Sequence, residues 1–514
     1  MWSILSDPVS GVDPATAAAA AAVPVAVYLV CRILFPNIDP REPPVLPPTI
    51  PFLGHILSLM REQNNMFHRL YQERKLPICT LPMLNGKMYV INEPRLVAAA
   101  MRNQNLSFEP FAVEFSTPTL GMDKKHVEIY SQPGTMDEFS HTIQQSMLGE
   151  NLAVMNSAAL KEIAKTLNDI SSREGLALES GFEWLRELMA LATLRSMFGS
   201  QNPLGKDSLN DLWEFDKGLG LLALGFAPNL LAPKALKARD RLQERLEPYY
   251  LKGLDQGDDV SPLMKLRGAK ERLIGFQDHE LTKPESSMLF VATSNTIPTL
   301  FWLFSHVMSD PALLSQVRAE VETITTVETD ANGRRIAATM NLAVYEKECP
   351  MLHAVYREIL RLYSDLVGTR RVMNDTTIRD PVTGQEYLLR KGINIQWASK
   401  VAHHVPDVWG DDSHEFKPER FLHATAVDEK KRRGAMIPFG GGKHLCPGRN
   451  FAKTENIGLV SALALGYDVV GVAVPPAGNS YLGTAVKRPI FEQKDPVRIT
   501  RRKGWEDVTW TFKC

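Results

Sequence analysis

The sequence predicts a mainly α-helical protein with small β-sheets, an α+β fold, in a chain of 514 residues. From about Leu148 to Ile324 the apolar residues recur at helical spacing and strand signals are few. A β-hairpin is predicted over residues 78–91, where Asn85-Gly86 supplies the turn. Further strand-like pieces return only late, around residues 387–389 and 497–500.

Composition and charge narrow the class of function. The chain has 58 Lys+Arg against 59 Asp+Glu, a formal net charge of -1, which gives no electrostatic reason to expect a nucleic-acid partner. The 5 cysteines are odd in number and widely spaced, without a C-x-x-C pair. They form neither a disulfide framework nor a zinc site, and they indicate a reducing compartment.

Residues 1–35 are predicted to form a single membrane anchor. The stretch from Ala15 to Cys31 is uncharged, and its apolar character resumes after Arg32 as far as Phe35. About 20 mostly apolar residues suffice to cross a bilayer, and the basic start typical of a signal peptide is missing. Because basic residues follow the stretch, the body is expected to stay cytoplasmic. The alternative is a flexible alanine-rich leader.

A proline-rich linker over residues 36–51 follows the anchor, and residues 52–514 are predicted to form one globular domain. Repeated prolines make the linker stiff and extended. Within the domain, the apolar stretch from Leu212 to Leu231 forms either a core helix pair or a lip that touches lipid and admits apolar substrates. The core interpretation is favoured.

The segment from Pro438 to Arg449 carries the most specific chemistry, because it places Cys446 among glycines. A cysteine thiolate can bind haem iron and donate electron density that favours O–O cleavage. Such a thiolate needs shielding and backbone N–H donors, and glycines let the backbone approach it closely. Amides of the helix expected near Phe451 would favour the anion, and Phe439 would exclude water. The alternative is a glycine-rich turn around a buried free cysteine.

This segment resembles the haem-binding signature of the cytochrome P-450 superfamily, F-x-x-G-x-[basic]-x-C-x-G. Phe439, Gly442, Cys446 and Gly448 match it, and His444 stands where the family usually has an arginine that binds a haem propionate. The resemblance implies haem b with Cys446 as the axial iron ligand. It also implies a single haem-thiolate monooxygenase fold behind the N-terminal transmembrane helix.

Two further segments support the resemblance. An amphipathic helix is predicted over residues 349–363, with Glu358 and Arg361 three residues apart on its surface. Alone, this would be an ordinary surface ion pair. It resembles the E-x-x-R element of the superfamily, and the loop of residues 416–421 supplies Arg420 as the third member. The implied role is a buried support beneath the cysteine loop. Arg370 is implied as a further propionate ligand, with Arg371 as the alternative.

On the oxygen side, a long helix is predicted from Ser286 to Met308, interrupted at Pro298, because a proline cannot donate to the carbonyl of Ser294. Residues 292–296 resemble the family pattern A-[AG]-x-[DE]-T. Thr296 matches the alcohol that helps deliver protons during oxygen activation, and Asn295 replaces the acid with an amide that can hold a water. Alternatively, Thr296 only bonds a preceding carbonyl.

The run from Asn295 to Pro298 looks like the group of bile-acid-forming sterol hydroxylases and prostacyclin synthase. It implies hydroxylation of a hydrophobic sterol, terpenoid or fatty-acid-like molecule, molecules of secondary metabolism included, with O2 and electrons from an NADPH-dependent flavoprotein reductase. The implied location is the endoplasmic reticulum membrane. Two alternatives are an isomerase or dehydratase that needs no external electrons and a non-enzymatic haem-binding sensor.

The resemblance also implies where substrate and reductase bind. The implied cavity walls are mainly apolar and suit a hydrophobic substrate; they are Phe108–Val127, Leu289–Thr299, Tyr363–Thr369 and Ser480–Ala485. The basic run of residues 430–433, with Lys443 and Arg449, forms either a docking face for the reductase or an ordinary solvated loop.

Overall fold

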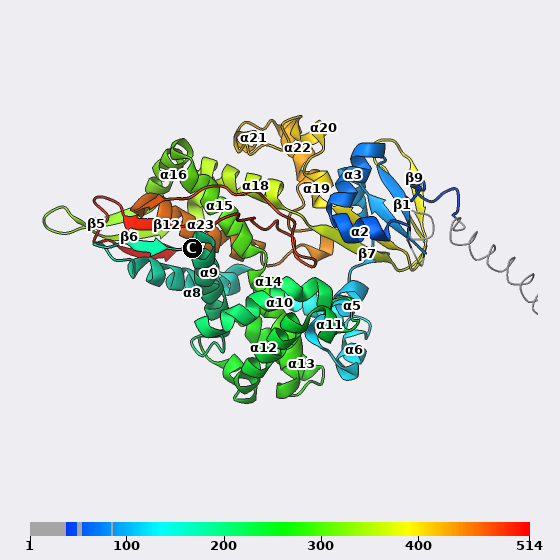
Figure 1. Ribbon diagram of the computed structural model, residues 1–514, viewed down its shortest axis with the longest axis horizontal. Helices are drawn as coiled ribbons and strands as arrows, with labels where there is room; N and C mark the ends of the chain where they lie inside the picture. Colours follow the sequence, from blue (N-terminus) through cyan, green and yellow to red (C-terminus); the bar gives the residue numbers. More distant parts are fainter. Residues whose placement is uncertain (1–37, 49–53, 84–85) are drawn as a thin grey trace, which may run out of the picture. The chain divides into compact units, whose positions relative to one another are not determined.

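The computed structural model describes residues 38–48, 54–83 and 86–514 (Figure 1). The chain divides into two compact units. The first contains Met1–Leu106 and Thr369–Trp397, and the second contains Ser107–Gly368 and Ala398–Cys514. The predicted anchor at residues 1–35 lies outside the described residues, as does part of the predicted linker. The anchor therefore stays a prediction.

The first unit is built around a sheet whose strands have the order β1-β2-β10-β7-β3. The predicted hairpin is confirmed: β1 and β2 are antiparallel, with Ile78 opposite Ile91 and Met83 opposite Gly86. The strand β10 then pairs with β2 in parallel. The elements are β1 Ile78–Met83, β2 Gly86–Ile91, β3 Leu106–Ser107, β7 Val367–Val372, β8 Thr376–Arg379, β9 Glu386–Leu389, β10 Asn394–Ala398, α2 Ile56–Glu62, α3 Asn65–Arg74 and α4 Pro94–Arg102.

The described part of the proline-rich segment lies against β1. Val45 forms a parallel bridge with Thr80, and the Leu46 N–H donates to the Thr80 carbonyl at 2.9 Å. The Thr80 hydroxyl donates to the carbonyl of Pro43 at 2.7 Å. Prolines cannot donate hydrogen bonds, but their carbonyls still accept them, so an extended proline-rich chain can line a sheet edge. Residues 43–46 thus belong to the packed body.

The second unit is mostly helical, as predicted, and carries two small three-stranded sheets, β11-β12-β4 and β13-β6-β5. The predicted late strand over residues 497–500 is confirmed as β12. The strands are β4 Leu176–Leu178, β5 Thr325–Thr329, β6 Arg335–Asn341, β11 Tyr467–Val470, β12 Val497–Arg501 and β13 Thr509–Lys513. The helices are α5 Glu109–Leu120, α6 Lys124–Tyr130, α7 Thr135–Ser146, α8 Gly149–Asn168, α9 Gly181–Phe198, α10 Leu209–Leu222, α11 Pro228–Leu231, α12 Pro233–Leu251, α13 Pro262–Leu273, α14 Thr282–Thr293, α15 Thr296–Ser309, α16 Pro311–Thr323, α17 Tyr345–Glu348, α18 Pro350–Tyr363, α19 Ser399–Ala402, α20 Pro406–Trp409, α21 Glu419–Leu422, α22 Ala426–Ala435 and α23 Arg449–Gly466.

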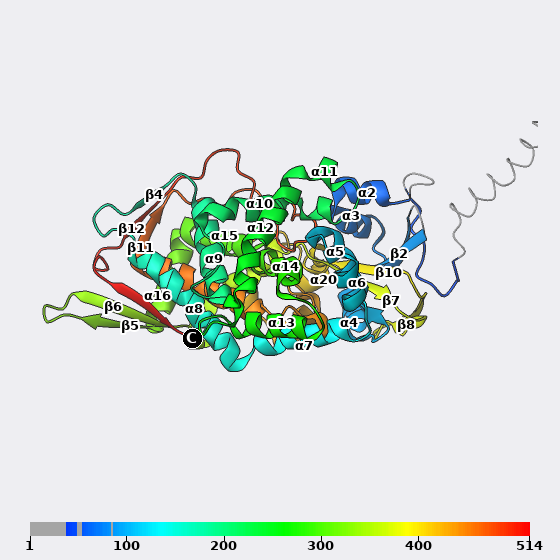
Figure 2. The same ribbon diagram turned by 90° about the horizontal axis from the view of Figure 1, so that it is seen from below.

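The helix α15 runs through the core of this unit and packs against α9, α16, α18 and α23; Figure 2 shows α9 beside it. Leu300, Trp302, Leu303 and Val307 are fully buried there. Among the described residues, only the run Asp278–Ser309 is long and apolar enough to cross a membrane, but 78% of its most apolar window is buried inside the protein. The run is therefore the core of the fold rather than a second membrane span.

The apolar stretch from Leu212 to Leu231 was predicted to be either a core helix pair or an exposed lip, and its two halves differ in this respect. In α10, Leu212, Phe215 and Leu219 are fully buried, as a core helix requires. The segment after α10 is instead exposed: Phe226 is 74% exposed and Leu230 is 79% exposed. The first half belongs to the core, and the second half presents large apolar side chains to the surroundings.

Candidate functional site

The cysteine loop joins the short helix α22 to α23. The Cys446 N–H donates to the Phe439 carbonyl at 3.0 Å, which closes the loop. Gly440 has a φ of 72° and Gly442 a φ of 64°, conformations that favour glycine. Burial raises the pKa of the Cys446 thiol, while the backbone N–H groups of Gly448 and Arg449 lower it. The predicted N–H donors at the start of α23 are therefore in place.

The other described cysteines lack these donors. Cys79 and Cys349 are buried, and burial raises the pKa of each thiol to about 12. Among the described residues, no three His, Cys, Asp or Glu side chains come together to hold a metal ion. A lone cysteine with backbone donors fits a metal that already has its other ligands in a macrocycle, as in haem.

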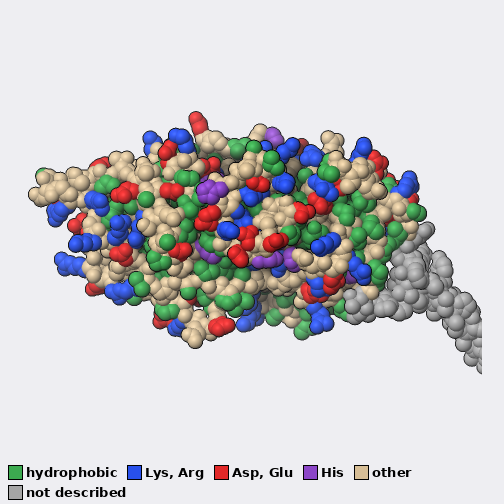
Figure 3. Space-filling view, turned by 90° about the horizontal axis from the view of Figure 1, so that it is seen from above, with side chains coloured by type: hydrophobic (Ala, Val, Ile, Leu, Met, Phe, Trp, Pro, Cys, Tyr) green, Lys and Arg blue, Asp and Glu red, His purple; other side chains and the backbone are tan. Residues whose placement is uncertain are grey.

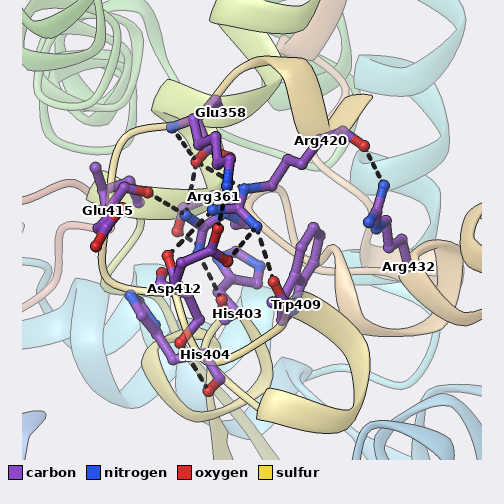
Figure 4. Close-up of polar contacts among 12 residues, drawn as sticks. Glu358, Arg361, His403, His404, Trp409, Asp412, Glu415, Arg420 and Arg432 are labelled. Carbon is purple, nitrogen blue, oxygen red and sulfur yellow. Dashed lines mark hydrogen bonds and ion pairs between the residues drawn. The ribbon is translucent and has the colours of Figure 1, made fainter. Parts of the chain in front are cut away.

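Glu358, Arg361 and Arg420 form one buried cluster (Figure 4). Arg361 donates to both carboxylate oxygens of Glu358 at 2.7 Å, and Arg420 Nε donates to Glu358 Oε1 at 3.0 Å. The side chains of Glu358 and Arg361 are fully buried, and that of Arg420 is 5% exposed. The predicted three-residue cluster is thus assembled by α18 and α21, and its bidentate pair has the geometry of a strong charge-assisted contact.

The two guanidinium groups also bind the backbone between α19 and α21. Arg361 donates to the carbonyls of His403, Ser413 and Glu415 at 2.9, 2.6 and 3.2 Å. Arg420 donates to the carbonyls of Trp409 and Asp412 at 2.8 and 3.1 Å. A buried ion cluster is tolerated when its remaining donors are satisfied in this way. The cluster therefore fixes the path of the chain that leads toward the cysteine loop.

His403 is a site residue that the sequence analysis missed. It is fully buried, its Nδ1 lies 3.0 Å from the Arg361 carbonyl, and its Nε2 accepts from the Ile437 N–H at 2.9 Å. Because a carbonyl only accepts and a backbone N–H only donates, the ring is the neutral tautomer with its proton on Nδ1. Burial lowers the pKa of His403 to about 3, so it stays neutral. The ring thus links the charged cluster to the loop that begins at Pro438.

The predicted long helix is broken at Ser294 and Asn295, one turn before Pro298. The break lies at the carbonyl that the proline leaves without a backbone donor. Asn295 Oδ1 accepts from the Ala485 N–H at 2.7 Å, so its amide nitrogen is the end that remains to donate.

The Thr296 hydroxyl differs in its hydrogen bonding from the hydroxyl groups of the neighbouring threonines on α14 and α15. Thr293 donates to the Leu289 carbonyl at 2.7 Å, and Thr299 donates to the Asn295 carbonyl at 2.8 Å. Thr296 is 6% exposed, and within the described part of the chain its hydroxyl has no such bond. The structure therefore gives no support to the alternative in which Thr296 only bonds a preceding carbonyl, and the role of its hydroxyl stays a prediction.

The remaining predicted haem contacts divide between the two units. In the second unit, the rings of His444 and Phe108 meet edge to face, with centroids 5.6 Å apart. Arg370 belongs to the first unit, where it is buried over the Trp397 ring and burial lowers its pKa to about 10. Arg371 instead donates to Asn394 Oδ1 at 3.1 Å. Of the two arginines, Arg370 is the one in a buried setting that favours an anionic partner.

The basic run lies on α22 rather than in a loop. Lys430, Lys431 and Arg433 are exposed, whereas Arg432 turns inward and donates to the Arg420 carbonyl. Lys443 pairs with Glu109 and Asp137 at 3.2 and 3.1 Å. Figure 3 shows basic and acidic side chains interspersed over the face that it draws. Arg449 donates to the Cys446 carbonyl at 3.0 Å. The exposed cations of α22 are therefore Lys430, Lys431 and Arg433, and their role as a docking face stays a prediction.

Comparison with known proteins gives a consistent result. The family model described as cytochrome P-450 matches residues 43–464. A cytochrome P-450 monooxygenase of Gibberella zeae is 35% identical over 95% of this chain and 94% of its own length. The cholesterol 7-alpha-monooxygenase of Cricetulus griseus is 26% identical over 90% of this chain and 95% of its own length. A solved structure described as retinoic acid bound cyanobacterial CYP120A1 superposes with a TM-score of 0.68 at 18% identity, covering 90% of this chain and 100% of that one.

Proposed function

Because the chain belongs to the cytochrome P-450 family of haem-thiolate monooxygenases, we propose that it hydroxylates a hydrophobic small molecule with O2 and reductase-supplied electrons. The observation that carries the proposal is the position of Thr296, which is only 6% exposed and begins α15 directly after the helix break. Membership of this family identifies the chain as an enzyme, and this excludes the alternative of a non-enzymatic haem-binding sensor.

In this proposal Cys446 would supply the thiolate that binds the haem iron, and the cysteine loop and its neighbours would hold the haem. When bound, haem supplies the iron that activates O2 for insertion into the substrate. The Gly448 and Arg449 N–H groups stabilise the thiolate, while Phe439 and Gly442 shape its pocket. His444 would bind a haem propionate, the same role for Arg370 stays a prediction, and the cluster of Glu358, Arg361 and Arg420 supports the loop.

On the oxygen side, Thr296 donates and passes on a proton at its Oγ1 atom. Asn295 is held through its Oδ1 atom by the Ala485 N–H, so it presents amide protons rather than a carboxylate. An amide positions water but does not itself titrate. Thr296 is therefore the residue of this pair that carries protons.

The proposed substrate is a sterol, terpenoid or fatty-acid-like molecule. The walls that support this class are mainly apolar with a few hydroxyl groups, so shape and one or two hydrogen bonds would orient the substrate. A relative is named a cholesterol 7-alpha-monooxygenase, and the Gibberella zeae protein is named only as a monooxygenase. The named relative supports a sterol-sized substrate as the first class to test.

We also propose an endoplasmic reticulum location, with a single N-terminal span and a cytoplasmic catalytic domain. Support comes from the exposed apolar segment after α10, where Leu224, Phe226 and Leu230 can lie in the lipid interface. An NADPH-dependent flavoprotein reductase would dock on the cations of α22, since opposite charges steer association. Those cations are Lys430, Lys431 and Arg433.

The decisive experiment is turnover of a sterol panel by the haem-loaded full chain with NADPH, reductase and O2. Hydroxylated product that requires all three supports the proposal. The second candidate, an isomerase or dehydratase of an oxygenated intermediate, is favoured by the amide at Asn295 in place of an acid. Conversion of a hydroperoxide substrate without NADPH or reductase, and no hydroxylation with them, would replace the first candidate by the second.

A further inference from the structure

A chain of aromatic rings connects α15 with the loop before α21. The Trp302 and Tyr363 rings are stacked almost parallel, with centroids 4.0 Å apart and planes 9° apart. The Tyr363 hydroxyl oxygen lies 2.7 Å from His306 Nε2, and the His306 ring stacks on Phe416 with centroids 3.8 Å apart. The Trp302 indole N–H donates to the Lys487 carbonyl at 2.9 Å. The chain of rings is therefore continuous and is fixed by hydrogen bonds at two points.

The inner end of this chain of rings lies between two helices of the proposed haem pocket. Trp302 lies on α15, six residues beyond Thr296, which is about 9 Å along the helix axis. Tyr363 is the last residue of α18, two residues beyond Arg361 of the buried cluster. The helices α15 and α18 pack against each other. The stacked pair therefore joins the helix of the oxygen side to the helix that supports the cysteine loop.

Exposure to solvent increases along the chain of rings. Trp302 is fully buried and Tyr363 is 7% exposed, whereas His306 and Phe416 are only partly buried. The inner rings are thus shielded from water, and the imidazole of His306 lies where a proton can be exchanged with solvent.

The pair of Tyr363 and His306 has the arrangement that a redox-active tyrosine needs. Burial raises the pKa of Tyr363 above its ordinary value and lowers the pKa of His306 to about 4, so the phenol keeps its proton and the imidazole is neutral. A neutral imidazole can accept a hydrogen bond at one ring nitrogen, and Nε2 is within reach for proton transfer. A phenol that loses an electron becomes a strong acid, so a base at this distance makes the loss easier.

We propose that Trp302, Tyr363 and His306 form a protective path that reduces the haem group when it is oxidised by a peroxide without substrate. Tyr363 gives one electron through Trp302 to the oxidised haem group, and its hydroxyl proton moves to His306 Nε2. This leaves a neutral phenoxyl radical beside an imidazolium. A thiolate in solution then gives one electron to the phenoxyl radical and becomes a thiyl radical, while His306 returns the proton. Each passage carries one electron and restores the protein.

The test mixes the haem-loaded full chain with hydrogen peroxide, without substrate, and freezes it within milliseconds for electron paramagnetic resonance. Ring-deuterated tyrosine is incorporated in parallel, because it narrows the signal of a tyrosyl radical. The variants are Tyr363→Phe, which keeps the ring stack and removes the hydroxyl, and His306→Gln, which removes the base. Tyr345→Phe is the matched control, because Tyr345 is also buried and its hydroxyl lies 3.4 Å from His353 Nδ1. Loss of haem absorbance in peroxide is recorded with a thiol present.

The wild type and Tyr345→Phe should show the tyrosyl signal, and Tyr363→Phe should lose it. His306→Gln should lower its yield several-fold, and peroxide should bleach the haem several-fold faster in Tyr363→Phe than in Tyr345→Phe. A signal of wild-type size in Tyr363→Phe or in His306→Gln, no tyrosyl signal in the wild type, or equal bleaching rates would each overturn the proposal. The test needs bound haem but no hydroxylation, so a lack of hydroxylated product would not affect it.

Discussion

Arg361 and His403 hydrogen-bond to each other in both directions. Arg361 Nη1 donates to the His403 carbonyl at 2.9 Å, and His403 Nδ1 donates to the Arg361 carbonyl at 3.0 Å. The opposite ring nitrogen of His403 accepts from the Ile437 N–H, two residues before Phe439. A neutral ring in a fixed tautomer thus connects the helix of the charged cluster to the loop of the proposed haem ligand.

His403→Gln is expected to lower both the stability of the fold and its haem content. Glutamine cannot span the two partners with the same geometry, and each buried group left unpaired costs about 1–3 kcal/mol. Haem per protein and the thermal midpoint of the purified variant measure the two effects. His404→Gln is the matched control, because His404 is buried beside His403 but its ring lies 2.9 Å from the Lys400 carbonyl. Equal haem loss in both variants would contradict the bridging role.

Acid should destabilise the protein through the same ring. The pKa of His403 is lowered by burial to about 3, below its ordinary 6.5. Above pH 6.5 the ring is neutral whether the chain is folded or not, so its contribution to stability is fully present. As the pH falls below 6.5, the unfolded chain binds a proton that the folded one does not, and stability falls by up to about 1.4 kcal/mol per pH unit. Urea unfolding between pH 7 and 4 measures the slope, which should be shallower in His403→Gln.

Arg361→Lys should be strongly destabilising although the charge is kept. Lysine cannot reproduce the two parallel bonds to Glu358 together with the bonds to three carbonyls, and it leaves buried acceptors unpaired. Breaking a buried pair typically costs about 3–5 kcal/mol. Soluble yield and the urea midpoint check this. Arg357→Lys on the same helix, where Arg357 pairs with Glu429 at 3.3 Å at the surface, should lose less than about 1 kcal/mol. Similar losses would show that the cluster adds no special stability.

The sequence predicted those structural features that depend on residues close together along the chain. The Asn85-Gly86 turn predicted the hairpin, Pro298 predicted the break at Ser294, and the spacing of Glu358 and Arg361 predicted one helical face. The sequence analysis missed His403 because its hydrogen-bond partners lie 42 and 34 residues away along the chain. A histidine next to another histidine does not by itself indicate a structural role. The pair Asn295 and Ala485 is separated by 190 residues. Such contacts arise from tertiary packing, which periodicity and spacing do not record.

Thr296→Ala should uncouple electron use from product formation if the proposed hydroxylation is correct. The hydroxyl is the buried proton donor at the break, so its loss should raise NADPH consumption per product several-fold while haem content stays unchanged. Product and NADPH are measured in the same reaction. Thr293→Ala is the control, because the Thr293 hydroxyl is bound to the Leu289 carbonyl. Unchanged coupling in Thr296→Ala would remove Thr296 from the proposed proton path.

Because of the buried carboxyl group of Glu455, we expect the free energy of unfolding to decrease as the pH rises above neutral. It is fully buried on α23, nine residues beyond Cys446, and accepts from the Thr193 hydroxyl at 2.9 Å. Burial raises its pKa from 4.5 to about 8, so the folded protein keeps a proton that the unfolded chain releases above pH 4.5. Its contribution to the free energy of unfolding is fully present below pH 4.5 and declines by roughly 1.4 kcal/mol per pH unit until about pH 8.

Glu455→Gln removes the titrating group, so the free energy of unfolding in urea should depend less on pH between pH 6 and 8. Glu162→Gln, on the partly exposed face of α8, should leave the wild-type slope intact. A Glu455→Gln protein with the wild-type slope would mean that other groups set the alkaline limit.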